Sequence, residues 1–481
     1  MYADLHCHAS AKPFLSAVSP INKISPWLKY SGSVPQIFYP IIGSQSSLSQ
    51  LQEGQVNLAV ISIVPFEKAL ANFWMIRDLV TTFTILDRPT LQHINKGNIS
   101  YNKLFWQEVE YLFRHSNYGN KKLNILETIE DFIPEENVIN AIIAIEGSHV
   151  LFNENNEPDN PIIRLRQIKN AATFNVFYLT ITHLSRNDYC NHAKGMKISK
   201  DKCFDPSLQT KGLDETGLEI IRECYDRANG PRILIDIKHM SLSARRQFYE
   251  FRRDNGYQDI PIIASHMGLT GFSYAALSEQ LKNKPSHSSN SLVELTYKNQ
   301  PYDQITFNPL SINLYDEEVL EVINSGGIIG LSLDQRILGR VEKNVRETVR
   351  RDELEEWINL ENNGLPQIER EKIEAGEKDK VGLRHLCLHI IHIIKLTGSK
   401  GWQHICLGSD FDGLIHPINS CKTASELPRL EELLLTELKK VIETSKVEIP
   451  CQDIRRHVRD FMFNNLSNFT QDYFCRQYLY G

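Results

Sequence analysis

The sequence lacks the features that mark several large classes of protein. Within its 481 residues no apolar run reaches the roughly 20 residues needed to cross a bilayer. Positive charge is not in excess, since 53 Lys and Arg stand against 59 Asp and Glu, for a net charge of −6. This balance argues against a nucleic-acid-binding protein that works by bulk charge. No repeat or low-complexity tract divides the chain, so we predict one domain over residues 1–481, with no nucleic-acid or membrane partner.

Paired cysteine motifs are also missing. The nine cysteines are scattered, their number is odd, and none forms a CxxC pair. Reduced thiols are therefore expected. The N-terminus has no basic segment followed by an apolar one, which is the pattern of a secretory signal peptide. From these two observations we expect a cytoplasmic protein.

What the chain does contain is a series of apolar, strand-like runs separated by segments with helical periodicity. Helices are predicted over residues 161–173, 217–228, 242–254, 316–325 and 381–395. Alternating strands and helices indicate a parallel sheet, and eight strands suggest a closed TIM-like (β/α)8 barrel of the α/β class. The eight strand candidates are residues 2–5, 56–64, 139–145, 174–182, 233–237, 260–265, 327–333 and 404–408.

Two polar stretches do not fit this alternation and are predicted to be insertions. Residues near 286–308 are irregular, whereas residues 340–380 are densely charged and favour helix. We therefore expect a barrel with helical insertions. A lid, a homodimer contact and surface decoration are the roles that we consider for them.

Side chains of the types that bind metals follow the apolar runs directly. The carboxyl ends of barrel strands meet at one mouth, so residues placed there converge. A histidine after one strand is commonly a solvated or capping residue, but six of eight strands ending this way favours a shared site. The set comprises His6, His8, Glu146, His183, His239, His266 and Asp410.

These residue types suit two divalent metal ions, with zinc as the expected metal. Imidazole and carboxylate are zinc ligands. His6 and His8 lie two apart on a strand and point to the same side, whereas Cys7 points to the other. Glu146 has two oxygens and is the natural bridge between two ions. Asp410 is positioned to accept a proton from water and pass it on, with a structural cap as the alternative role.

The motifs that carry these residues resemble those of the renal (membrane) dipeptidase family, part of the amidohydrolase superfamily. They occur in the family's order over residues 1–415. The matching segments are DLHCH at 4–8, AIEGSH at 144–149, YLTITH at 178–183, DIKHMS at 236–241, IASH at 263–266 and GSDFDG at 408–413. The combination of IEG, DIKHMS and GSDFDG is specific.

The resemblance implies a role for each residue. His6 and His8 would bind the first metal, Glu146 would bridge, and His239 and His266 would bind the second. His183 would polarise the substrate and face the tetrahedral oxyanion, and Asp410 would be the proton shuttle. The implied reaction is hydrolysis of the amide of a dipeptide or a dipeptide-like small molecule, with a metal-bridging hydroxide as the nucleophile.

The chain departs from the family pattern at two positions. Family members usually have Asp where this chain has His8, which remains a good metal ligand. They also hold the substrate carboxylate with an Arg next to an Asn, and the best match here is Ile312 before Asn313. An apolar side chain cannot replace the two-point contact of a guanidinium. The candidate replacements are Arg186, our choice for a substrate-binding residue, and Arg336 and Arg340.

Two other functions remain open at this point. A metal-dependent phosphoesterase is one, because a His-X-His start also occurs in metal phosphoesterases with barrel-like folds. The other is a catalytically altered metal-binding barrel that serves as a scaffold, which the missing Arg and the insertions favour. The GSDFDG segment and the single Glu146 favour the dipeptidase-like hydrolase.

Overall fold

The computed structural model describes most of the chain. The described residues are 1–17, 22–30, 43–72, 86–184, 187–193, 211–282, 287–289, 291–298, 307–339, 344–361, 365, 380–444 and 453–481.

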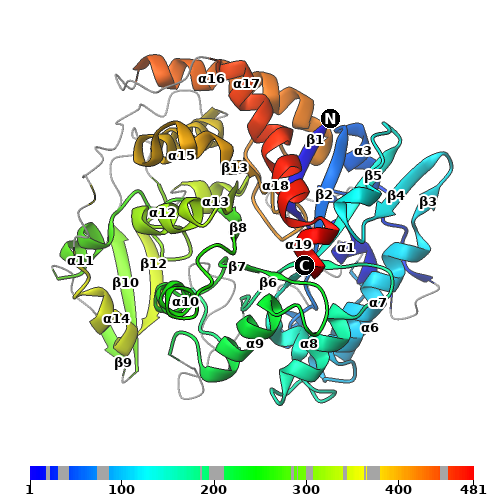
Figure 1. The fold of residues 1–481 in the computed structure, drawn as a ribbon, viewed down its shortest axis with the longest axis horizontal. Coiled ribbons are helices and arrows are strands. Elements are labelled where there is room, and N and C mark those ends of the chain that lie inside the picture. Colours follow the sequence, from blue (N-terminus) through cyan, green and yellow to red (C-terminus); the bar gives the residue numbers. More distant parts are fainter. Residues whose placement is uncertain are drawn as a thin grey trace.

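Eight parallel strands form the centre of the molecule, in the order β1-β2-β5-β6-β7-β8-β11-β13. This is the predicted α/β barrel, and each strand lies within a few residues of its predicted run (Figure 1). Strand β5 is buried along its whole length, as expected for a parallel sheet that is covered on both faces. The strands are β1 (Tyr2–Cys7), β2 (Val56–Ile63), β5 (Val138–Glu146), β6 (Val176–Thr180), β7 (Leu234–Asp236), β8 (Ile262–Met267), β11 (Ile328–Leu331) and β13 (Ile405–Leu407).

The barrel closes between its first and last strands, at their carboxyl ends. The N–H of Asp410 donates to the carbonyl of His6 over 2.9 Å, and the N–H of His8 donates to that of Phe411, also over 2.9 Å. The carboxylate of Asp4 adds to this seam, because one oxygen accepts the Ser409 N–H at 2.9 Å and the other accepts its hydroxyl. The segment that holds Asp410 is thus fixed directly to the segment that holds both N-terminal histidines.

Helices surround the barrel, as the alternating pattern predicts. Each of the five helices named from periodicity is present, and α10 has the predicted bounds. Their polar caps fit local rules: Asp214 caps α9 and Ser241 caps α10 through side-chain oxygens. The five are α8 (Pro161–Lys169), α9 (Glu215–Tyr225), α10 (Leu242–Asp254), α12 (Asp316–Asn324) and α15 (Val381–Thr397).

The connection from β2 to β5 is longer than one helix. A hairpin of β3 (Asn117–Tyr118) and β4 (Lys121–Ile125) follows its last helix, and β4 extends the sheet by pairing in parallel with β5. This hairpin was not predicted from the sequence. The helices here and before β2 are α1 (Ala11–Phe14), α3 (Leu48–Glu53), α4 (Lys68–Asn72), α6 (Arg88–Asn95) and α7 (Tyr101–Arg114).

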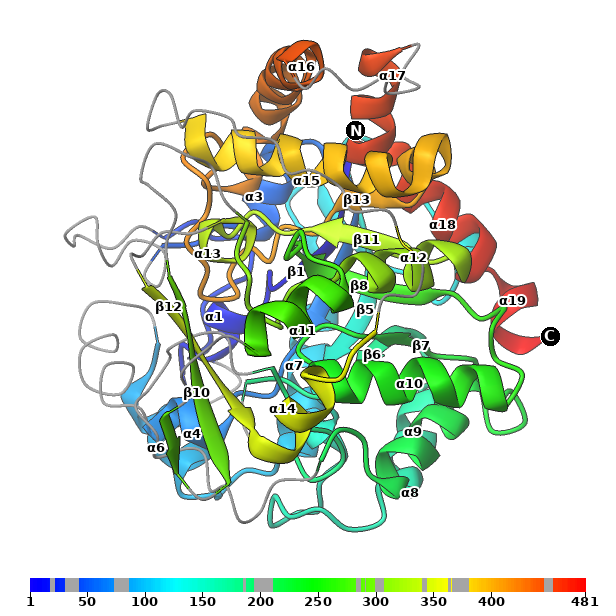
Figure 2. The same ribbon diagram turned by 90° about the vertical axis from the view of Figure 1, so that its left-hand side faces the viewer.

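The two predicted insertions meet in a separate antiparallel sheet, ordered β12-β10-β9. The first insertion is therefore not irregular as expected, and the second contains a strand, β12, as well as the expected helix, α14. Val293, Leu295 and Tyr297 are buried and alternate with exposed residues, which is the period of a strand. The sheet lies at one edge of the molecule beside α11 and α14 (Figures 1 and 2). Its elements are α11 (Tyr274–Lys282), β9 (His287–Ser289), β10 (Leu292–Lys298), β12 (Asn344–Arg350) and α14 (Arg351–Trp357).

The C-terminal helices pack beside β1 and the N-terminus (Figure 1). Tyr2 donates to Glu431 of α16 over 2.6 Å, and Asn465 donates to the carbonyl of Ile405 over 2.7 Å. None of the helices in the described part of the chain has both the length and the apolar character needed to span a bilayer. The remaining helices are α13 (Gln335–Leu338), α16 (Leu427–Thr444), α17 (Ile454–Arg459), α18 (Asn465–Tyr473) and α19 (Arg476–Tyr480).

Candidate active site

The side chains predicted to form one site do converge at the carboxyl ends of the strands. His6 lies in β1 and His8 directly follows it, Glu146 ends β5, and His266 lies near the end of β8. His183, His239 and Asp410 come from the segments after β6, β7 and β13. All seven line one site. For all but His183, less than a tenth of the residue surface is exposed.

The two N-terminal histidines present the same ring atom to the centre of the site. Tyr178 donates its hydroxyl to the carbonyl of Leu5 over 3.0 Å, so it accepts from Nδ1–H of His6 over 2.8 Å. His8 donates Nδ1–H to the carbonyl of Ser62 over 3.0 Å. In both rings the proton is therefore on Nδ1, and the lone pair of Nε2 is free to bind a metal ion. These two Nε2 atoms lie 3.1 Å apart.

A second pair of histidines lies on the other side of Glu146. The Nε2 atoms of His239 and His266 are 3.3 Å apart. Nδ1 of His266 lies 2.8 Å from the hydroxyl of Ser265, which itself donates to Asp236. This arrangement again leaves Nε2 of His266 directed into the site. Nδ1 of His239 is buried and has no hydrogen-bond partner within the described structure.

Glu146 lies between the two pairs, with one carboxylate oxygen toward each. Its Oε2 is 3.3 Å from Nε2 of His8 and 3.7 Å from Nε2 of His6. Its Oε1 is 3.0 Å from Nε2 of His239 and 3.5 Å from Nε2 of His266. Burial alone would raise the pKa of Glu146, but the surrounding histidines, with His183 and His6 foremost, hold that pKa well below its ordinary value. Glu146 is thus kept anionic.

Asp410 lies beside the first pair, on the segment that is hydrogen-bonded to that of His6 and His8. Its Oδ1 is 3.5 Å from Nε2 of His8 and 4.0 Å from Nε2 of His6. Burial raises the pKa of this carboxyl group above its ordinary value. Both Asp410 (φ 62°) and His239 (φ 66°) have left-handed backbone conformations, which cost energy outside glycine and cluster at functional sites.

His183 is held by a residue that the sequence analysis did not identify. Its Nδ1 lies 2.9 Å from Oε2 of Glu67, a buried residue that follows β2, and its Nε2 lies 3.7 Å from Oε2 of Glu146. Burial opposes protonation, but Glu146 and Glu67 outweigh it and raise the pKa of His183. The ring is therefore fixed with Nε2 directed toward the carboxylate of Glu146.

The donor set fits divalent metal ions. Three overlapping groups of ligand atoms each lie within 4.8 Å of one another: His6 with Glu146 and His266, His6 with His8 and Asp410, and Glu146 with His183 and His239. Pairs of unprotonated imidazole nitrogens 3.1–3.3 Å apart repel each other unless positive charge lies between them. Imidazole and carboxylate donors at such spacing are typical of zinc sites.

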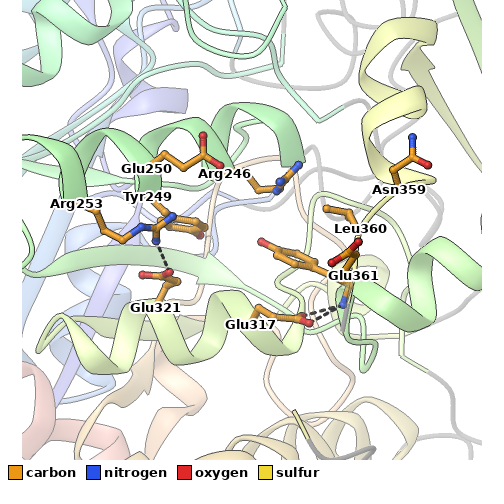
Figure 3. A pocket seen from close by; sticks show the side chains of 10 residues that line it. Arg246, Tyr249, Glu250, Arg253, Glu317, Glu321, Asn359, Leu360 and Glu361 are labelled. Atoms are coloured by element: carbon orange, nitrogen blue, oxygen red, sulfur yellow. Dashed lines mark hydrogen bonds and ion pairs between the residues drawn. The ribbon is translucent and has the colours of Figure 1, made fainter. Parts of the chain in front are cut away.

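A cavity of about 60 Å³ opens onto this cluster and is lined by six of the seven residues, His6 being the exception. A larger cleft of about 430 Å³ lies elsewhere, between α10 and α12, and contains none of the seven (Figure 3). In that cleft Arg253 pairs with Glu321 over 2.8 Å, and Glu317 accepts the N–H of Tyr274. The chemistry predicted from the sequence therefore belongs to the smaller cavity.

None of the arginines predicted as candidates for binding the substrate carboxylate is found at the cavity within the described structure. Arg186 and Arg340 lie outside the described residues. Arg336 is engaged by Asp334, with the closest contact at 2.6 Å, and also donates to the carbonyl of Leu414 over 3.0 Å. Ile312 is completely buried in the apolar cluster beside the small antiparallel sheet and is not part of the cavity wall. Within the described structure no arginine lines the cavity.

A family model described as membrane dipeptidase (peptidase family M19) matches residues 304–447. This confirms the resemblance to the membrane dipeptidase family. Together with the fold, the match indicates a metal-dependent hydrolase. The matched segment is less than a third of the 481 residues and includes Asp410 but none of the five predicted metal ligands. The assignment of those five ligands therefore depends on the geometry described above and not on the family match.

The fold is similar to that of several solved structures. A metallo peptidase from Rhodobacter sphaeroides, liganded with a phosphinate mimic of the dipeptide L-Ala-D-Ala, is 13% identical, with a TM-score of 0.54 over 98% of both chains. The dipeptidase AC, a metallo peptidase of family M19, gives the same values. The probable dipeptidase PvdM from Pseudomonas aeruginosa is 14% identical, with a TM-score of 0.50 over 89% of this chain and 88% of its own. At these identities the likeness is one of fold.

Proposed function

We propose that this protein hydrolyses the amide bond of a dipeptide or a dipeptide-like small molecule, using two zinc ions. The observation that carries the proposal is the position of Glu146, whose Oε2 faces His6 and His8 while its Oε1 faces His239 and His266. One carboxylate between two histidine pairs is the donor arrangement that a pair of divalent ions needs. The family match supports the choice of an amide substrate.

Two ions held here would polarise the scissile carbonyl and make water a stronger acid. The residues of the chain supply the remaining functions. His183 presents Nε2 to the site, where a ring that is fixed through Nδ1 can donate to the carbonyl oxygen as negative charge develops. Asp410 borders the same cavity and is placed to take the proton of the attacking water and return it to the leaving amine.

Metal content and turnover measured together test this proposal. The protein, exchanged with zinc, is analysed by mass spectrometry for bound metal and assayed against a dipeptide panel with and without chelator. About two zinc ions per chain and cleavage that the chelator abolishes are expected. Each dipeptide is paired with its C-terminal amide, and the ratio of kcat/KM shows whether the free carboxylate is recognised. Phosphoester substrates in parallel test the phosphoesterase alternative.

The variant Asp410→Asn should keep the metal and lose activity by about 10² to 10⁴-fold, the usual contribution of a general base. Asp254→Asn is the matched control, because Asp254 is exposed at the end of α10 and far from the strands' carboxyl ends. Protein that binds no zinc would refute the metal site. Zinc binding with phosphoester cleavage alone would refute the amide substrate.

A further inference from the structure

Leu414 has a backbone conformation that its side chain does not favour. It has φ +62°, in the left-handed region, and it is the third such residue in the loop after β13, together with Asp410 and Asp412. Aspartate tolerates this region because its short polar side chain can hydrogen-bond locally. Leucine has no such compensation, so the conformation of Leu414 must be imposed by its surroundings, and such residues cluster where function needs them.

Two contacts hold this part of the loop in place. Arg336 donates from Nη2 to the carbonyl of Leu414 over 3.0 Å, and Arg336 is itself fixed by the fully buried Asp334. Gly413 packs so tightly on Asp410 that a Cβ there would lie 2.0 Å from Oδ1. Leu414 thus directly follows the glycine that packs against Asp410, the residue that we propose as the proton shuttle.

The strained backbone presents the leucine side chain to the active-site cavity. Leu414 is half-buried and lines the cavity that also contains His183 and Asp410. Phe66 and Leu184, from the segments after β2 and β6, are the other half-buried apolar residues of the wall with large side chains. Behind them the wall is continued by buried apolar side chains, those of Leu15, Leu70 and Leu86.

Among the described residues, the charged side chains of the wall beyond the seven-residue cluster already have partners of opposite charge. Nζ of Lys12 lies 2.8 Å from Oδ1 of Asp412, and both residues are buried. Glu67 binds His183 over 2.9 Å. A charged group of the substrate that entered this wall would lose water without gaining an opposite charge, which is costly.

We propose that Leu414, Phe66 and Leu184 form a subsite for an apolar side chain of the substrate. This inference rests on the proposed amide hydrolysis and specifies its substrate class: dipeptides in which one residue is apolar and uncharged. Leu414 is the specificity-determining residue, because the loop that carries Asp410 holds it against the site.

The test is a matrix of dipeptides in which Leu, Ala, Asp or Lys occupies each position in turn beside alanine. At one of the two positions, kcat/KM for leucine should exceed that for aspartate and lysine by at least about 100-fold, and that for alanine by about 10-fold, the discrimination that apolar pockets reach. Equal kcat/KM for leucine, aspartate and lysine at both positions would overturn the subsite.

Binding measurements separate this inference from the proposed reaction. Calorimetric titration of zinc-loaded Asp410→Asn protein with the same dipeptides needs no turnover. If no dipeptide is cleaved by the unaltered protein, the proposed function fails. The subsite then stands if leucine-containing dipeptides bind at least 10-fold more tightly than those with aspartate, and it falls if they do not.

The variant Leu414→Asn keeps a residue that tolerates the left-handed conformation and makes the wall polar. The ratio of kcat/KM for leucine to alanine dipeptides should fall about 10-fold. Leu435→Asn on α16 is the matched control, a half-buried leucine outside the cavity, and should leave that ratio unchanged. Phe66→Ala provides a second test. It enlarges the cavity and should shift the substrate preference toward dipeptides with larger apolar side chains. An unchanged ratio in both wall variants would refute the assignment.

Discussion

The hydroxyl oxygen of Ser265 lies 2.8 Å from Nδ1 of His266. The same hydroxyl donates to Oδ2 of Asp236 over 2.7 Å, so it accepts the Nδ1 proton of His266. Asp236 also accepts the hydroxyl of Thr180 over 2.7 Å. Through Ser265, a buried carboxylate in β7 fixes the tautomer of a proposed metal ligand in β8, and it does so without touching the ring.

We therefore predict that Ser265→Ala weakens zinc binding by about 10- to 100-fold, the effect usual for partners of metal-binding histidines. Removing the hydroxyl frees His266 to rotate and to exchange tautomers. Competition with a chromophoric chelator measures the affinity directly. Thr180→Val is the control, because it removes a hydrogen bond to Asp236 and leaves the contact to His266 intact. Equal affinity in Ser265→Ala and the unaltered protein would show that Ser265 does not support the ligand.

The two histidine pairs around Glu146 give a second prediction. His239→Ala should reduce bound zinc from about two ions to about one per chain, because His6, His8 and Glu146 still provide a three-ligand set. His6→Ala should remove the other ion. Mass spectrometry of the metal-exchanged variants gives the stoichiometry. Loss of both ions from each variant would indicate a single cooperative site, which contradicts the separate pairs.

Most of the fold and of the candidate site could be predicted from the sequence because both depend on the same local pattern. An apolar run that ends in a ligand-type residue, as with His183 after 174–182, marks at once a buried strand and a position at the barrel mouth. The alternation of strands and helices then determines the topology. Asp4 and Asp236, carboxylates inside apolar runs, gave a signal for supporting residues that the prediction did not use.

Other features depend on contacts that no local pattern encodes. Glu67 follows β2 and contacts His183, which follows β6, so neither segment alone indicates the pair. The sheet of β10 and β12 joins two insertions, with Leu292 opposite Arg350 and Lys298 opposite Asn344. Dense charge over 340–380 favoured helix, and Arg351–Trp357 is helical. In β12, burial of alternate residues against the partner strand decided the structure instead.

Glu67 offers a third prediction, which concerns positioning. Glu67→Ala should lower kcat by about 10- to 100-fold, because His183 loses the group that orients its ring. KM and bound zinc should change little. Glu67→Gln should restore part of kcat, since its side-chain carbonyl can accept the same Nδ1–H. A loss of zinc in Glu67→Ala would instead assign Glu67 to the metal site, and an unchanged kcat would remove it from catalysis.

Glu347 in β12 makes a prediction about pH. It is buried and accepts the backbone N–H of Ser311 over 3.0 Å and the hydroxyl of Tyr297 over 3.3 Å. Burial raises the pKa of Glu347 to about 7, although these hydrogen bonds oppose the shift. The folded protein therefore holds this proton more tightly than the unfolded chain does. Stability from the protonated group is present below about pH 4.5 and is lost as pH rises toward 7.

The variant Glu347→Gln has no ionisable group at this position, so it removes the loss of stability at high pH. Its side-chain carbonyl can still accept the hydrogen bond from Ser311. It should raise the free energy of unfolding at pH 8 by about 1 to 3 kcal/mol relative to the unaltered protein, with a smaller difference at pH 5. Urea unfolding at both pH values measures this. Glu294→Gln in β10 is the control, because Glu294 is exposed and pairs with Arg346 at the surface. A stability difference that does not change between pH 5 and pH 8 would show that Glu347 remains charged within the sheet.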